Sequence, residues 1–154
     1  MHGLRFARTL ALAAALALPS AVSAQDAFEI QVYEYLTVPK GRWNLETHLN
    51  HVGRGTRVAT GPVVPTTGQN HLTFELTRGL TDYVELAGYV LTSTRQHVSG
   101  EFAGWRVRPR VRLPENLLPV RVSLSAEVGF PQRAYDENSI TLEVRPIIEQ
   151  SWGR

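Results

Sequence analysis

Hydrophobic and polar residues alternate along most of the chain after residue 40, with the period of two that is typical of β-strands. In the stretch 119–130, for example, Val122 and Leu124 alternate with Arg121, Ser123 and Ser125. No stretch after residue 24 shows a helical period. The alternation predicts strands at 42–53, 70–78, 82–94, 102–113, 119–130 and 138–149, preceded by a short extended segment at 28–36.

One face of these predicted strands is apolar, whereas the other carries charges of both signs. The charged positions are Arg106, Arg108, Arg110, Arg112, Arg121, Arg145, Glu46, Glu75, Glu85, Glu127 and Glu143. In a soluble barrel the apolar face would point inward. In a membrane barrel it would face lipid, and the charges would line the lumen. Alternation alone is compatible with both arrangements.

Strand length and loop length favour the membrane arrangement. Most predicted strands are longer than the about 5–6 residues common in soluble proteins and reach the about 9–11 that a membrane strand needs. The short connections VPKG, RGLTD and PENLLP alternate with longer ones, of which 54–69 is the longest. We therefore predict an all-β fold, the antiparallel up-and-down meander of an outer-membrane β-barrel.

The first 24 residues have the pattern of a secretory signal peptide. Arg5 and Arg8 precede the apolar run LALAAALAL, and small residues end the segment at Ala24. This predicts export and insertion into the bacterial outer membrane, with lipid as the main partner. The expected organisation is a signal peptide at 1–24, an N-terminal extended segment at 25–41 and a barrel domain at 42–154.

Charge and composition narrow the function. The chain has 16 basic and 14 acidic residues, and removing the signal peptide leaves 14 of each, because Arg5 and Arg8 are lost. A balanced charge does not favour nucleic-acid binding. There is no cysteine, and no cofactor is expected. A channel or transport role for small solutes fits an exported barrel best, and the oligomeric state stays open.

The most basic stretch, WRVRPRVRLPE at 105–115, places an arginine at every second position. We interpret these arginines as part of a structural lattice of ion pairs with Glu85 and Glu127 on the neighbouring strands. An anion-selective wall is the alternative. Pro109 and Pro146 interrupt predicted strands, so we expect a bulge or a lost ladder bond at each.

No sequence motif indicates catalysis. His48 and His51 are predicted to face opposite sides of one strand, so no metal site is expected. Glu46 and His48, with Ser123 or Ser125 across the lumen, would be the pair of an outer-membrane lipid hydrolase, a less favoured alternative. A soluble exported barrel that binds a small apolar ligand is the other alternative. It requires the inward-pointing side chains Leu45, Phe74, Leu86, Val107 and Leu124.

The stretches IQVYEYLTVPKGRWNLETHLNHV, LTFELTRGLTDYVELAGYVL and LEVRPII resemble a poorly characterised group of bacterial outer-membrane β-barrel proteins. These are of the phenol meta-degradation pathway type, with transporter-like relatives. The resemblance covers most of 28–149 and implies an outer-membrane barrel with a role in the uptake of small compounds. It assigns no functional residue.

The end of the sequence departs from this pattern, because SWGR has no terminal aromatic residue. Six strands, or seven with 28–36, are also fewer than the eight of the smallest single-chain barrels. We therefore expect a barrel that is truncated at its C-terminal side, with an open, strongly curved sheet or a strained closure.

Overall fold

The structure is a computed structural model that describes residue 28 and residues 32–95 and 98–150. The predicted signal peptide at 1–24 and the final SWGR lie outside the described residues. No helix of the described chain is long and apolar enough to cross a membrane.

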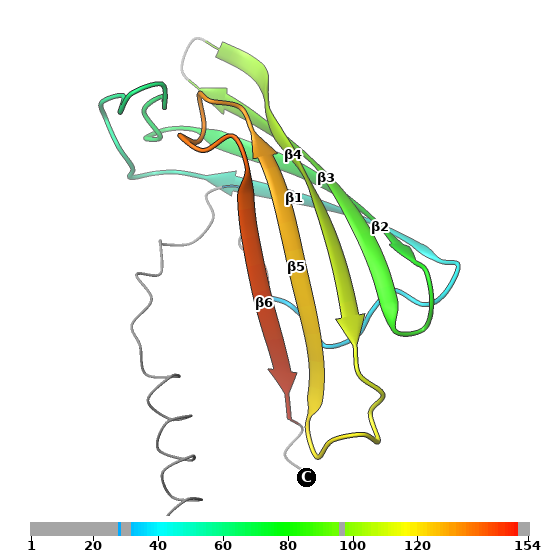
Figure 1. The fold of residues 1–154 in the computed structure, drawn as a ribbon. Coiled ribbons are helices and arrows are strands. Elements are labelled where there is room, and N and C mark those ends of the chain that lie inside the picture. The colour runs from blue at the N-terminus through cyan, green and yellow to red at the C-terminus, as the bar shows by residue number, and fades with distance from the viewer. Residues whose placement is uncertain (1–27, 29–31, 96–97, 151–154) are drawn as a thin grey trace, which may run out of the picture.

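Six antiparallel strands form one sheet in the order of the sequence (Figure 1), which confirms the predicted all-β meander. They are β1 (Trp43–His51), β2 (Asn70–Gly79), β3 (Val84–Arg95), β4 (Val98–Arg112), β5 (Arg121–Pro131) and β6 (Thr141–Glu149). The sheet is strongly curved, but within the described residues β1 and β6 do not pair, so it is not closed. Closure into a barrel therefore stays a prediction.

The two faces of the sheet differ sharply in polarity. The register aligns one apolar row across all six strands, composed of Leu45, Leu76, Gly88, Val107, Val128 and Leu142. This outer face is open to solvent, with Leu45 66% and Leu142 72% exposed. The adjacent positions carry polar side chains on the other face, and Thr73, Glu75 and Arg108 are among those that are buried there.

The N-terminal segment, residues 32–38, forms no strand and packs against the polar face, which we call the inner face. Tyr35 is fully buried there and donates a hydrogen bond from its hydroxyl to the Leu113 carbonyl. Phe28 stacks on His71 near the opposite end of the strands. The described part of the segment predicted at 28–36, residue 28 and residues 32–36, therefore packs on the inner face and forms no strand there.

The prolines leave the register unshifted. The ladder between β4 and β5 has no pair at Arg108 and Pro109, but it resumes in the same register, so an interruption replaces a bulge. Pro146 pairs with Leu124 in an uninterrupted ladder on β6. Within the described residues β6 lies at the edge of the sheet, where proline is tolerated. The prediction of a bulge or a lost ladder bond is therefore confirmed at Pro109, as lost pairing without a bulge, whereas at Pro146 the register shows neither a bulge nor a gap. The irregularities instead lie between β3 and β4, at Leu91/Thr92 and Ser93/Arg95.

The chain that leads from the N-terminal segment to β1 lies tightly against β2 at Gly79. A Cβ atom there would lie 2.2 Å from the Pro39 carbonyl oxygen and 2.4 Å from that of Val38, whereas one at Gly88 would meet nothing within 4 Å. We predict that Gly79→Ala lowers the free energy of unfolding by about 1–3 kcal/mol, because backbone must move. Gly88→Ala, the control, should change it by less than about 1 kcal/mol. Urea unfolding of both variants measures this, and equal effects would contradict the packing.

Candidate functional site

The centre of the inner face is a buried cluster of charges around Arg108 on β4. Its guanidinium lies 2.5 Å from a carboxylate oxygen of Glu75 on β2 and 3.5 Å from one of Glu85 on β3. Both glutamates are completely buried and Arg108 nearly so. The rings of Tyr33 and Tyr89 lie 5.5 and 5.4 Å from the guanidinium carbon. These three charges from three strands hold one another in a site where an unpaired charge would be very costly.

Further ion pairs extend this cluster along β4 and toward β5 and β6. Arg106 lies 3.1 Å from Glu127, and Arg110 lies 2.7 Å from Glu85. At the far edge, pairs of 2.6 and 2.7 Å join the more exposed residues Arg145–Glu143 and Arg121–Glu149. All the arginines that the sequence placed on the polar face are thus on the inner face, and each lies near a carboxylate. This arrangement is that of an ion-pair lattice.

Two of these arginines also hold the N-terminal segment. Arg110 donates hydrogen bonds of 3.0 and 2.9 Å to the backbone carbonyls of Glu34 and Leu36. Arg112 donates to the Thr37 hydroxyl at 3.1 Å and to the Asp82 carbonyl at 2.8 Å. Because three of these four contacts go to backbone carbonyls, no pattern of side chains in the sequence indicated them.

Tyrosine rings of the segment pack on the same arginines. The guanidinium carbon of Arg145 lies 3.7 Å from the centre of the Tyr33 ring. The guanidinium carbons of Arg112 and Arg121 lie 5.4 and 5.9 Å from the centre of the Tyr35 ring. Such cation–π contacts stabilise by about 0.5–2 kcal/mol each, depending on how far they are desolvated. The segment is therefore held by rings as well as by hydrogen bonds.

A partly open cavity of about 510 Å³ remains between the segment and the strands. It is lined by the segment 32–39 on one side and by Asn44, Glu46, Thr77, Glu85, Arg108 and Arg110 on the other. Its wall therefore offers carboxylates and guanidinium groups beside the apolar side chains of Val32, Leu36 and Trp43, a lining that suits small molecules with polar or charged groups.

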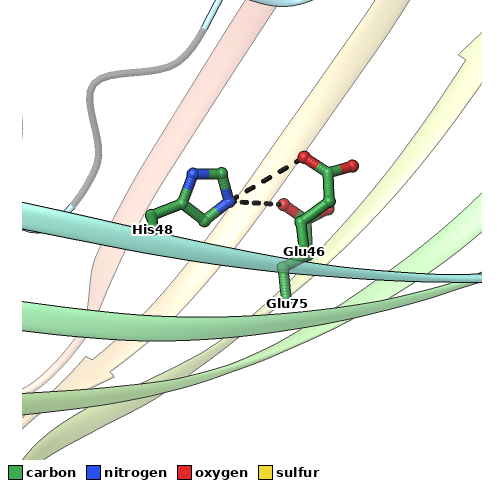
Figure 2. A group of neighbouring side chains, drawn as sticks. All are labelled: Glu46, His48 and Glu75. Carbon is green, nitrogen blue, oxygen red and sulfur yellow. Dashed lines mark ion pairs between the residues drawn. The ribbon is translucent and has the colours of Figure 1, made fainter.

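Next to this cavity, Glu46, His48 and Glu75 point toward one another (Figure 2). His48 Nε2 lies 3.9 Å from Glu46 Oε2 and 3.7 Å from Glu75 Oε2. His51, three residues along β1, is exposed and contacts Asn70 at 2.8 Å. The spacing had correctly separated the two histidines but had not shown that β2 supplies a second glutamate to His48.

The serines proposed for a hydrolase lie on the inner face of β5. Ser123 and Ser125 are both buried, and neither hydroxyl has a hydrogen-bond partner among the described residues. Neither is therefore bonded to His48. A serine nucleophile needs a hydrogen bond to a neighbouring base to be activated. Neither serine has such a bond to His48.

A smaller polar group near the β3–β4 connection was not indicated by the sequence. Tyr135 donates a 2.7 Å hydrogen bond to Glu101, which also pairs with Arg95 at 3.1 Å. Burial, together with the hydrogen bond to the Glu101 carboxylate, raises the pKa of Tyr135. The tyrosine therefore stays protonated and acts as a fixed donor that ties the loop after β5 to β4.

Comparison of the chain with family models, with curated proteins and with solved structures finds no match. The resemblance to outer-membrane barrels therefore stays an expectation from the sequence.

We predict that Arg108→Met lowers the free energy of unfolding by about 3–5 kcal/mol, because two buried carboxylates lose their shared partner. Arg121→Met is the matched control: it removes an arginine from the exposed pair with Glu149 and should cost about 1 kcal/mol or less. Chemical unfolding of the two variants under identical conditions distinguishes them. A loss for Arg108→Met as small as that of the control would show that the buried cluster is not coupled as described.

Proposed function

We propose that this chain forms the wall of an outer-membrane β-barrel that acts as a channel or transport-related protein for small polar solutes. One observation carries the proposal: the sheet buries charged side chains such as Glu75, Glu85 and Arg108 and exposes most of its large apolar side chains. A protein in water adopts the opposite arrangement, since burial of apolar surface drives folding. In a membrane barrel the apolar face meets lipid and the polar face lines the lumen.

The length and continuity of the apolar surface support this proposal. The aligned row from Leu45 to Leu142 crosses every strand, and a second one joins Phe74, Val90, Trp105 and Phe130. Trp105 and Phe130 stack with ring centres 4.2 Å apart. Exposed apolar patches of such extent are rare on soluble monomers. The predicted signal peptide and the resemblance noted above agree with this location.

The arrangement argues against the soluble alternative. A soluble barrel with an apolar ligand requires Leu45, Phe74, Leu86 and Leu124 to point inward, yet these side chains are 41–66% exposed on the outer face. The lipid-hydrolase alternative receives no support either, because the Ser123 and Ser125 hydroxyls have no hydrogen-bond partner in the described part of the chain.

Within the described residues the sheet ends in two unpaired edge strands, β1 and β6. Backbone groups at the edge of a sheet cannot remain unpaired in lipid. We therefore infer that further strands, from the same polypeptide or from other copies, lie between β6 and β1 in the membrane. The pairing of the inner-face arginines with carboxylates favours a structural lattice over an anion-selective wall.

Membrane insertion can be tested with one position on the outer row. Leu76, 47% exposed on β2, should face acyl chains. We predict that Leu76→Arg weakens membrane insertion by about 2–4 kcal/mol, whereas Leu76→Met leaves it within about 1 kcal/mol. The fraction of each variant that stays with membranes after an alkaline carbonate wash measures the effect. Recovery of the native chain as a soluble monomer without detergent would overturn the proposal.

Transport can be tested through the N-terminal segment. Tyr33→Ala removes the ring that packs on Arg108 and Arg145, so we predict faster influx of small solutes into vesicles that contain the full-length variant. Phe102→Ala, which removes an exposed ring of β4, is the control and should leave influx unchanged. Vesicle swelling rates report influx. Native and Tyr33→Ala proteins that both conduct no better than empty vesicles would exclude a channel role.

A further inference from the structure

We propose that Glu46, His48 and Glu75 form a binding site for a divalent transition-metal cation of the zinc type on the inner face. Each offers one ligand atom, and the three atoms lie within 4.8 Å of one another. Imidazole nitrogen and carboxylate oxygen are both ordinary zinc ligands, with bond lengths of about 2.0–2.2 Å. The site rests on this geometry and does not depend on the proposed membrane location.

The spacing is close to that of a coordination sphere. Ligand atoms on one tetrahedral zinc ion lie about 3.3–3.6 Å apart, as the bond lengths require. The distances from His48 Nε2 to Glu46 Oε2 and Glu75 Oε2 are 3.9 and 3.7 Å. All three ligand atoms lie within 4.8 Å of one another, so side-chain rotations that draw them together would bring them onto one ion. Figure 2 shows both carboxylates directed at the same ring nitrogen.

Neighbouring groups already orient the two carboxylates. The other oxygen of Glu46, Oε1, accepts a 2.6 Å hydrogen bond from the Asn44 amide. The corresponding oxygen of Glu75 accepts one of 2.9 Å from the Thr77 hydroxyl and pairs with Arg108. Outer partners of this kind fix the orientation of metal ligands. Each carboxylate thus turns one oxygen to a structural partner and the other toward His48.

His48 presents a ring nitrogen without a hydrogen bond to the two carboxylates. Its Nε2 atom is buried and makes no hydrogen bond among the described residues. An imidazole nitrogen in such a position, facing two carboxylate oxygens, has the place and the lone pair of a metal ligand.

The charged groups around the site include more carboxylates than guanidinium groups. Three carboxylates, those of Glu46, Glu75 and Glu85, share this part of the inner face with the two guanidinium groups of Arg108 and Arg110. This set carries one negative charge more than positive charge. An excess of negative charge attracts a cation electrostatically.

Glu46 also lines the cavity of about 510 Å³, so the site has a path to solvent. Three protein ligands leave a fourth tetrahedral position open for water or for a small anionic solute. The ion would thereby add a positive anchor to the cavity wall.

The test is a zinc titration of the untagged, full-length protein after chelator treatment, followed by calorimetry. We expect one equivalent of Zn²⁺ to bind, and no binding of Mg²⁺ at the same concentration, because magnesium prefers an all-oxygen octahedral set. His48→Ala should weaken zinc binding at least about tenfold. His51→Ala is the matched control from the exposed side of the same strand and should bind zinc as the native chain does.

Glu46→Gln provides a second variant, because Glu46 is partly exposed and its loss leaves no buried charge unpaired. It should also weaken zinc binding while the unfolding midpoint without metal stays unchanged. Absence of zinc binding by the native chain, equal affinity of His48→Ala and His51→Ala, or binding unaffected by Glu46→Gln would each overturn the site. None of these outcomes bears on membrane insertion, which the Leu76 variants test separately.

Discussion

The structure depends on the pairing of charges that it buries on the inner face. Arg108 joins Glu75 and Glu85, so that one side chain of β4 neutralises parts of β2 and β3. An isolated buried ion would cost several kcal/mol, and this cost fixes the register of the three strands. A shift by one residue would turn each charge to the apolar face. The ion pairs thus determine which side of the sheet is inner.

The same pairing accounts for the N-terminal segment. Arg110 and Arg112 have donor groups in excess of what their carboxylate partners can accept. The segment supplies the missing acceptors through the carbonyls of Glu34 and Leu36 and the hydroxyl of Thr37. Its tyrosine rings lie against the guanidinium groups of Arg108, Arg112 and Arg145. Without this segment, water would have to satisfy the polar groups of the interior. Here the chain itself satisfies a large part of their hydrogen bonds.

Alternation of residue type was sufficient to predict the six strands, their order and the division of charged and apolar faces. It failed where backbone geometry decides. The β4 strand begins at Val98 instead of 102, because irregular pairing near Ser93 and Arg95 extends the hairpin. Nor could it reveal partners from separate strands, such as Glu75 beside His48. The contacts of the N-terminal segment could not be predicted either, because they join residues far apart in the sequence. The Tyr35 backbone amide, for example, donates to Glu149, which lies 114 positions further along the chain.

The attachment of the N-terminal segment to β1 has a consequence for anything that enters the cavity. Because residues 39–42 connect the segment directly to the first strand, it behaves as an intramolecular competitor for Arg110 and Arg112. A short tether gives such a competitor an effective concentration on the order of millimolar or above. A free solute that carries carbonyl or carboxylate oxygens must exceed this value, or bind more tightly, to displace it. Occupancy of the interior is therefore set by a covalent connection as much as by its lining.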